Sequence, residues 1–171
     1  NQMSIAENHG GMYDQFAELR RTNGAAENNL FKSMGLDYLY VNDGNDIEAL
    51  IAAFEQVKDT THPVVVHINT LKGKGYAPAE ANKEKWHWHM PFDIQTGQSP
   101  TSGASESYAS IFAEYTLKRA KTDSKFLVLM SAVPGLLGLT QERREELGKH
   151  YLDVGIAEET AVAMASGAAH A

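Results

Sequence analysis

The stretch "LDYLYVNDGNDIEALIAAFEQVKDTTHPVVVHINT", Leu36 to Thr70, decides the fold class of this chain. It opens with a short aromatic and aliphatic run, which is typical of a strand. Asn45 or Asp46 then caps a helix. Apolar residues recur along that helix at helical spacing and form one stripe: Ile47, Leu50, Ile51, Phe54 and Val57. The apolar run after Pro63 predicts a strand buried on both faces. Together the pattern predicts a βαβ unit and a parallel α/β sheet.

The segment upstream of this stretch is more polar. "MYDQFAELRR", residues 12–21, predicts a short helix. "TNGAAENN", residues 22–29, is a polar break in which we expect disorder. "NLFKSMG" follows and predicts a helix that stops at Gly35.

A stretch rich in Gly, Ser, Thr and Pro, residues 96–107, predicts a linker between two α/β domains, residues 1–95 and 108–171. After it, "SYASIFAEYTLKRAKTD" predicts an amphipathic helix and "KFLVLMS" a buried strand. "AVPGLLG" predicts a loop and "TQERREELGKH" a charged surface helix. "YLDVGIAEE" predicts a strand end followed by a helix start. Both domains therefore look incomplete, as in a fragment of a longer protein.

Composition excludes several classes of protein. Of the 171 residues, 43% are apolar and 22% are charged, which is ordinary for a globular protein. A net charge of −7 argues against a general nucleic-acid binder. The sequence holds no membrane-length apolar run, no signal-peptide pattern and no cysteine. We expect a cytoplasmic protein without nucleic-acid or membrane partners.

Three segments could carry chemistry, and the first is "KGKGY", Lys72 to Tyr76. It follows a predicted buried strand, so its backbone N–H groups and lysines would lie at the carboxyl end of a parallel sheet, where ligands bind. The glycine-to-lysine spacing is wrong for a Walker loop. A solvated basic turn without a ligand is the alternative.

The second segment is "WHWH", Trp86 to His89. On a strand, alternating histidines could offer two metal ligands from one face, but a metal site needs a third ligand and supporting contacts. Alternatively, one histidine points into a site and the tryptophans pack it in place, or the histidine is a buried structural residue.

The third segment is "GIAEET", Gly155 to Thr160. A carboxylate in the first turn of a helix is favoured by the helix dipole, and that alone explains it. Held among small apolar residues in a dry place, however, Glu158 could exchange a proton with a bound ligand or hold its protonated nitrogen.

Taken in order, "NQMSIAEN", "HINTLKGKGYAPAE…WHWHMPFD…TG" and "YLDVGIAEETAV" resemble parts of the 1-deoxy-D-xylulose-5-phosphate synthases. These are thiamine-diphosphate enzymes of the transketolase type. The resemblance implies α/β domains that hold the cofactor between a diphosphate-binding domain (residues 1–95 here) and a pyrimidine-binding domain (108–171), usually across a homodimer. It also implies that the alanine-rich helix after Glu158 is a buried packing helix.

The resemblance also implies roles for individual residues. Asn1 and the Met3 carbonyl match two ligands of the Mg²⁺ ion that bridges the protein to the cofactor diphosphate, and oxygen ligands suit that metal. Lys72 matches a lysine that reaches towards phosphate. His87 matches an active-site histidine, unless His89 enters the site instead. Glu158 matches the glutamate that contacts N1′ of the aminopyrimidine ring. Four residues differ from those usual in the family at their positions: Trp88, His89, Glu159 and Thr160.

The activity that the resemblance implies is the condensation of pyruvate with glyceraldehyde 3-phosphate, with loss of CO₂, to 1-deoxy-D-xylulose 5-phosphate, an isoprenoid precursor. "KGKGYAPAE" and "DVGIAEE" favour this synthase over a transketolase, which transfers a two-carbon ketol unit. A non-catalytic α/β interaction or regulatory module is the third interpretation.

Overall fold

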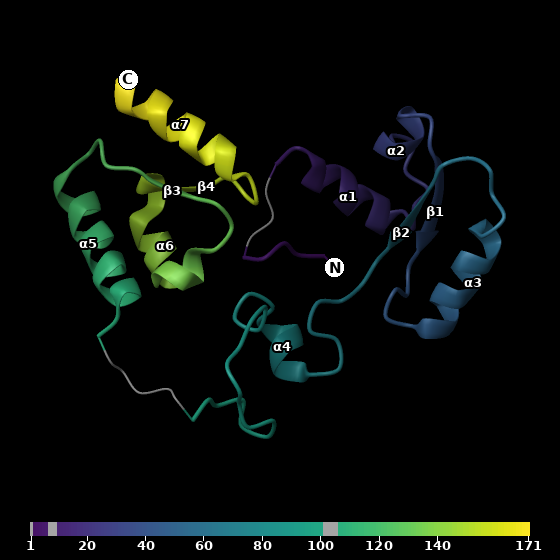
Figure 1. Ribbon diagram of the computed structural model, residues 1–171, viewed down its shortest axis with the longest axis horizontal. Helices are drawn as coiled ribbons and strands as arrows, with labels where there is room; N and C mark the ends of the chain where they lie inside the picture. Colours follow the sequence, from purple (N-terminus) through teal and green to yellow (C-terminus); the bar gives the residue numbers. More distant parts are fainter. Residues whose placement is uncertain (1, 7–9, 101–105) are drawn as a thin grey trace. The chain divides into compact units, whose positions relative to one another are not determined.

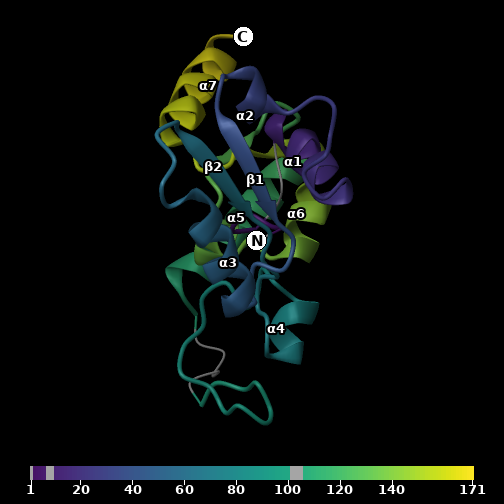
Figure 2. The same ribbon diagram turned by 90° about the vertical axis from the view of Figure 1, so that its right-hand side faces the viewer.

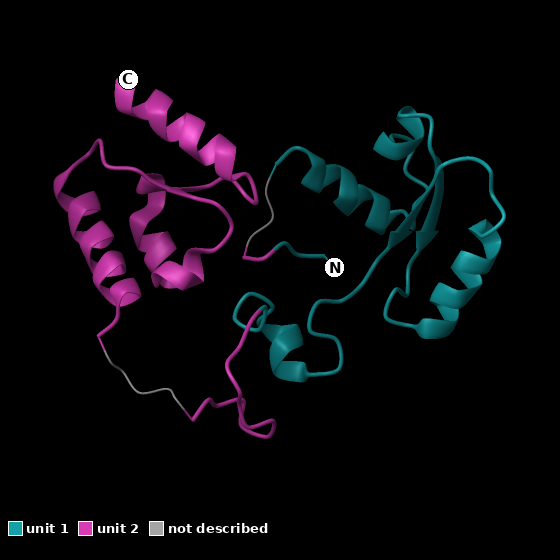
Figure 3. Ribbon diagram, viewed as in Figure 1, with its two compact units in different colours: residues 1–4, 10–87 teal, residues 5–9, 88–171 magenta. Residues whose placement is uncertain are grey.

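The computed structural model describes residues 2–6, 10–100 and 106–171 (Figure 1). They belong to two compact units, residues 1–4 with 10–87 and residues 5–9 with 88–171 (Figure 3). Each unit contains a two-stranded parallel sheet and helices, so the predicted α/β class is confirmed. The domain limits drawn from the sequence, with a linker at 96–107, remain a prediction.

The first unit is built on the predicted βαβ stretch. Its strands are β1 (Asp37–Val41) and β2 (Val64–Ile68), joined through helix α3 (Ile47–Val57). The strands pair in parallel with Tyr40 opposite His67 and Leu39 opposite Val66. Asp46 caps α3, because its carboxylate accepts the N–H groups of Glu48 and Ala49. The remaining helices of the unit are α1 (Met12–Arg21), α2 (Leu30–Ser33) and α4 (Ala77–Ala81).

An aromatic cluster covers one face of this small sheet. Side chains two residues apart on a strand share a face, so Tyr38 and Tyr40 lie together, and His67 stands opposite Tyr40. Helices α1 and α2 add Phe16 and Phe31, whose rings lie 5.8 and 6.5 Å from the His67 ring. Figure 2 shows α1 and α2 beside the two strands. These aromatic contacts hold α1 and α2 on the sheet.

The outer parts of this unit are less buried than the sequence predicts. All five residues of β2 are half-buried, not buried on both faces. The reason is that each described sheet has two strands, so β2 has a paired edge on one side only. In α3 only Ala53 is buried, whereas Ile47, Ile51 and Phe54 are 65, 50 and 50% exposed. The apolar stripe is wider than the part of it that the sheet covers.

The expectation of disorder at residues 22–29 is wrong. A turn there is closed by Gly24, whose N–H donates to the Leu19 carbonyl at 2.7 Å. The segment ends at Asn29, which is 2% exposed and caps α2 through its side-chain oxygen. Local capping bonds order a segment whose composition is that of a loop.

The second unit contains strands β3 (Val128–Met130) and β4 (Tyr151–Asp153), paired in register from Val128 opposite Tyr151. Its α-helices are α5 (Tyr108–Thr122), α6 (Gln141–Leu147) and α7 (Glu158–His170). Two short 3₁₀ helices are η1 (Pro134–Leu137) and η2 (Gly148–His150). The core residues come from α5, β3, the η1–α6 connection and α6: Ala113, Val128, Met130, Leu139 and Leu147.

Three expectations for this unit need correction. The predicted "AVPGLLG" loop contains the helical turn η1, because Pro134 begins it with a preset backbone angle. Helix α6 is not wholly a surface helix, since Arg144 and Leu147 are buried. Helix α7 is not a buried packing helix, because none of its residues is buried and Val162 is 71% exposed. Its alanines have no second layer to pack on within this unit as described.

None of the helices formed by the described residues is both long and apolar enough to cross a lipid bilayer.

Candidate functional site

The carboxyl ends of β1 and β2 are tied to each other by backbone bonds. Asn69 donates its N–H to Val41 O at 2.9 Å and accepts the Gly44 N–H at 2.9 Å. Its side-chain amide reaches the Asn42 carbonyl at 3.2 Å. A Cβ at Gly44 would lie 2.6 Å from the Asn69 carbonyl oxygen, so only glycine permits this approach. The two loops therefore form one edge at the place where ligands bind in parallel sheets.

Lys72 connects this edge to the beginning of the chain. Its Nζ donates to the carbonyl oxygen of Ser4 at 2.8 Å, and the side chain is half-buried. Burial lowers the pKa of Lys72, while the nearby charge of Glu84 acts in the opposite direction. Gln2 adds a second tie, because its amide nitrogen lies 3.3 Å from Asn69 Oδ1. The half-buried Met3 thus stands between two residues that are bonded to the sheet edge.

The "KGKGY" turn is shaped by its glycines. Gly73 and Gly75 have φ angles of +85° and +96°, which side chains rarely adopt. A Cβ on Gly73 would lie 2.7 Å from the carbonyl carbon of Ala79 in α4. Gly75 N–H donates to the Glu80 carboxylate at 2.9 Å. The turn is thus folded against α4. Lys74 is exposed, as expected for a solvated basic turn, whereas Lys72 is half-buried.

The "WHWH" segment is not a strand. Trp86 N–H donates to Asn82 O and His87 N–H to Glu84 O, at 3.2 and 3.1 Å, so residues 82–87 turn. The histidines therefore do not share a strand face, because the backbone is not extended. His87 is exposed, and His89 is half-buried with Nδ1 2.8 Å from Met90 O. Within the described ranges, no His, Cys, Asp and Glu side chains gather as a metal-binding group.

Trp86 has a structural partner. Its ring meets the ring of Tyr76 edge-on, with the centroids 5.0 Å apart, and so joins the segment to the end of the "KGKGY" turn. Residues 76–86 therefore form a closed excursion after β2, and the tryptophan packs that excursion.

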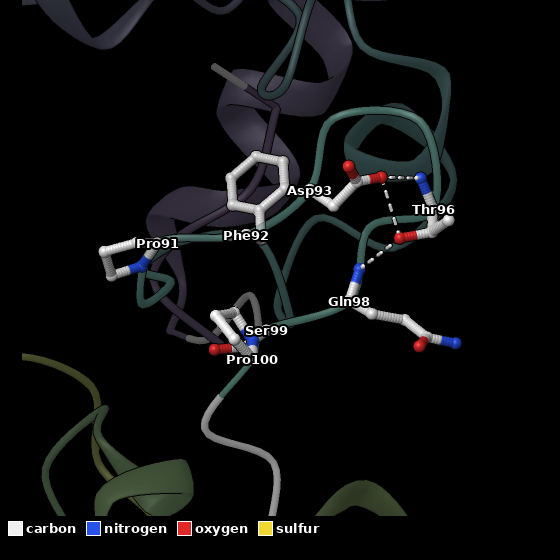
Figure 4. Close-up of a pocket in the computed structure, with 7 residues that line it drawn as sticks. All are labelled: Pro91, Phe92, Asp93, Thr96, Gln98, Ser99 and Pro100. Carbon is white, nitrogen blue, oxygen red and sulfur yellow. Dashed lines mark hydrogen bonds between the residues drawn. The ribbon is translucent and has the colours of Figure 1, made fainter.

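A shallow cup of about 450 Å³ follows, and its lining comes from this part of the chain: Pro91, Phe92, Asp93, Thr96, Gln98, Ser99 and Pro100 (Figure 4). Asp93 Oδ1 accepts the Thr96 hydroxyl at 2.9 Å and the N–H groups of Gln95 and Thr96 at 3.0 and 2.8 Å. These bonds lower the pKa of Asp93, and the bond from the Thr96 backbone N–H has the largest effect. The Asp93 carboxylate is thus occupied by hydrogen bonds within its own turn. In this structure the motif stabilises a loop and does not present a free carboxylate.

In the second unit, Glu158 begins α7 as the sequence predicts. Its side chain is exposed, so the dry surroundings expected for it are not present among the described residues of this unit. The turn before it is fixed by Asp153, a buried residue at the end of β4. Asp153 Oδ1 accepts the N–H groups of Ala132 and Gly155 at 3.0 and 2.8 Å, and Oδ2 accepts the Tyr151 hydroxyl at 3.1 Å.

The structure brings together Lys72 and the segment that carries Met3, both in the first unit. Glu158 and His89 belong to the second unit, and Asn1 lies outside the described residues. Sequence reasoning missed Asp153 and Asn69. An aspartate at a strand end, two residues before a glycine, is the signal that could have found the first, since short polar side chains commonly bond the backbone of a following turn.

Both units have parallel strands. In the first, a glycine-rich basic turn follows the second strand, and in the second, a glutamate begins the helix after the second strand. These features agree with the transketolase-type class. Residues 21–70, which include β1, α3 and β2, match a family model described as 1-deoxy-D-xylulose-5-phosphate synthase.

Curated relatives extend this match. The chain is 37% identical over 142 residues to 1-deoxy-D-xylulose-5-phosphate synthase of Halothermothrix orenii, a match that covers 83% of this chain and 22% of that protein. It is 41% identical over 140 residues to the enzyme of that name from Desulforudis audaxviator, covering 82% of this chain and 22% of the relative. By sequence, the chain belongs to the 1-deoxy-D-xylulose-5-phosphate synthase family. It spans about a fifth of the length of these relatives (22%).

Proposed function

We propose that the full-length protein carrying this chain condenses pyruvate with glyceraldehyde 3-phosphate, releasing CO₂ and forming 1-deoxy-D-xylulose 5-phosphate. The observation that carries the proposal is the identity of 37 and 41% to relatives named for this reaction, over about four-fifths of the chain (83 and 82%). The "KGKGY" and "GIAEET" segments follow β2 and β4, at the strand ends where a parallel fold places its ligands.

The cofactor of the proposed reaction is thiamine diphosphate with Mg²⁺, and the first unit would hold its diphosphate. Lys72 would bind a phosphate oxygen, because an ammonium forms strong charge-assisted bonds to such oxygens. Asn1 and the Met3 carbonyl would ligate the metal, as the family pattern implies. The bond from Lys72 to Ser4 supports this arrangement, since it keeps the lysine next to the segment that carries Met3. This bond is the observation that supports placing the diphosphate at this edge.

The chemistry that bound thiamine diphosphate supplies is a nucleophilic thiazolium carbon for the keto group of pyruvate. Glu158 would hold a proton at N1′ of the aminopyrimidine ring, which is the task expected of a carboxylate beside a ring nitrogen. His87 would contact substrate oxygens or move a proton there. Its exposed position leaves it accessible to such a group.

The test is CO₂ release from pyruvate by the full-length protein, with thiamine diphosphate, Mg²⁺ and glyceraldehyde 3-phosphate present. Release that depends on the aldehyde supports the synthase. Turnover of a ketose phosphate instead would make the protein a transketolase, and turnover of neither donor would favour a non-catalytic module. The homodimer and the cytoplasmic location also remain predictions.

A further inference from the structure

We propose that Asp153 is a positioning residue that sets the start of α7 and thereby the placement of Glu158. The inference rests on the role proposed for Glu158 above. It adds a residue that would not touch the substrate or the cofactor, but would act through the backbone.

The first observation is the set of bonds that Asp153 accepts. One carboxylate oxygen takes N–H groups from two different loops: Ala132, after β3, and Gly155, after β4. The second oxygen takes the Tyr151 hydroxyl, which fixes the plane of the carboxylate. Asp153 is only 9% exposed, so water competes little for these bonds. One side chain thus joins the carboxyl ends of both strands of the sheet.

The second observation is that both partners have unusual backbone angles. Ala132 has a φ of +64° and Gly155 a φ of +77°. For alanine this left-handed conformation is strained and persists only where its surroundings hold it. The bond from its N–H to Asp153 is part of what holds it. Gly155 adopts the same left-handed conformation without strain because it has no Cβ.

The third observation concerns how α7 begins. Helices α3, α5 and α6 are capped by the side chains of Asp46, Ser107 and Thr140. At the same position α7 has Ala157, which has no side chain that can accept a bond. The start of α7 is set instead by the turn before it, where Ala157 N–H donates to Gly155 O at 2.8 Å. Gly155 is in turn bonded to Asp153, so a short path of hydrogen bonds runs from the buried carboxylate to Ala157, which directly precedes Glu158.

Three variants of the full-length protein test the path. Asp153→Ala removes the three hydrogen bonds described above. Asp153→Asn keeps an oxygen that can accept the two N–H groups. Asp123→Ala is the matched control, because Asp123 also accepts a loop N–H, that of Lys125, but before β3, away from the turn that leads to α7.

Hydrogen exchange, read at single amides, is the first measurement, and it does not depend on any activity. In Asp153→Ala we expect the amides of Ala132 and Gly155 to exchange about tenfold faster or more, with most protection restored in Asp153→Asn. Asp123→Ala should leave both amides unchanged. Unchanged exchange in Asp153→Ala would overturn the inference, whatever the protein catalyses.

Turnover in a double-mutant cycle is the second measurement. We expect Asp153→Ala to lower kcat about tenfold or more with a smaller change in KM, because a catalytic group displaced by a fraction of an ångström loses rate rather than binding. In a Glu158→Ala background the same substitution should cause no further loss. A full further loss there would mean that Asp153 acts only on stability and would overturn the inference. Absence of turnover in the unmodified protein would instead count against the proposed function, and the exchange data would then decide the inference alone.

Discussion

The Nζ atom of Lys72 donates a hydrogen bond to the carbonyl oxygen of Ser4 at 2.8 Å, although 68 positions separate the two residues. This bond joins the loop after β2 to the opening segment of the chain. An ammonium in this place can serve two acceptors, because it has three N–H donors. The bond therefore keeps the ammonium beside the backbone that carries Met3.

The first prediction is that Lys72→Met weakens the binding of thiamine diphosphate by about ten- to a hundredfold, because it removes a charge-assisted bond and a tie to the opening segment. The measurement is calorimetric titration of the full-length protein with the cofactor in the presence of Mg²⁺. Lys74→Met is the matched control, since Lys74 is in the same turn but exposed. Equal affinities for both variants would contradict the role of Lys72.

The second prediction compares the two glycines of the turn. Alanine at either position is strained by the positive φ, but at Gly73 its Cβ would also lie 2.7 Å from the Ala79 backbone, whereas at Gly75 no described atom lies within 4 Å. We expect Gly75→Ala to cost about 1–3 kcal/mol of stability and Gly73→Ala clearly more, with a larger loss of cofactor affinity.

Thermal unfolding and cofactor titration of the two variants, each in the full-length protein, check this order. Equal losses would mean that the close approach to α4 relaxes freely. A larger loss at Gly75 would mean that the N–H bond from Gly75 to Glu80, rather than the packing of Gly73, sets the shape of the turn.

Local pattern was enough to predict most of the elements in the first unit. The strand at 37–41, the helix at 47–57 and the strand at 64–68 follow from periodicity and from a cap that bonds only its own neighbours. The degree of burial did not follow. The Val64–Ile68 run predicts burial on both faces, but burial depends on which strands and helices surround it, and that is not written in the run itself.

The site was less predictable for a related reason. Lys72 and Glu158 could be proposed as site residues because their motifs are local and resemble a family. Asp153 was missed because its partners Ala132 and Gly155 come from two loops that meet only through the pairing of β3 with β4. The "WHWH" alternation predicts a strand, whereas bonds to Asn82 and Glu84 turn the chain instead. Local side-chain and backbone bonds of this kind compete with strand formation.

The third prediction concerns His67, whose Nδ1 lies 2.7 Å from the Tyr38 hydroxyl. Burial lowers the pKa of His67 below 6.5, and the charge of Arg20 acts in the same direction. The unfolded state then binds a proton at a higher pH than the folded state. Stability should therefore be full above about pH 6.5 and decline as the pH falls from there through the folded-state pKa.

Urea midpoints of the full-length protein at about pH 7.5 and about pH 5.5 measure this decline. His67→Phe should reduce it, because the titrating group is gone, while His62→Asn should not, because the His62 side chain is 76% exposed. A decline of the same size in His67→Phe would assign the pH dependence to other groups. An NMR titration of His67 gives its pKa directly, and a value at or above 6.5 would contradict the prediction.

The fourth prediction is that Glu158→Ala lowers turnover by about a thousandfold or more, while cofactor affinity falls by about tenfold or less. The difference is expected because a carboxylate that holds a proton at a ring nitrogen contributes more to reaction than to binding. Glu159→Ala is the matched control, since Glu159 is also exposed in the first turn of α7 and shares its dipole. Turnover and calorimetric titration of both variants, in the full-length protein, separate the two effects.

If Glu158→Ala retained normal turnover, the carboxylate would be only a favourable charge at a helix start. If both variants lost turnover equally, the helix start rather than one side chain would be what matters.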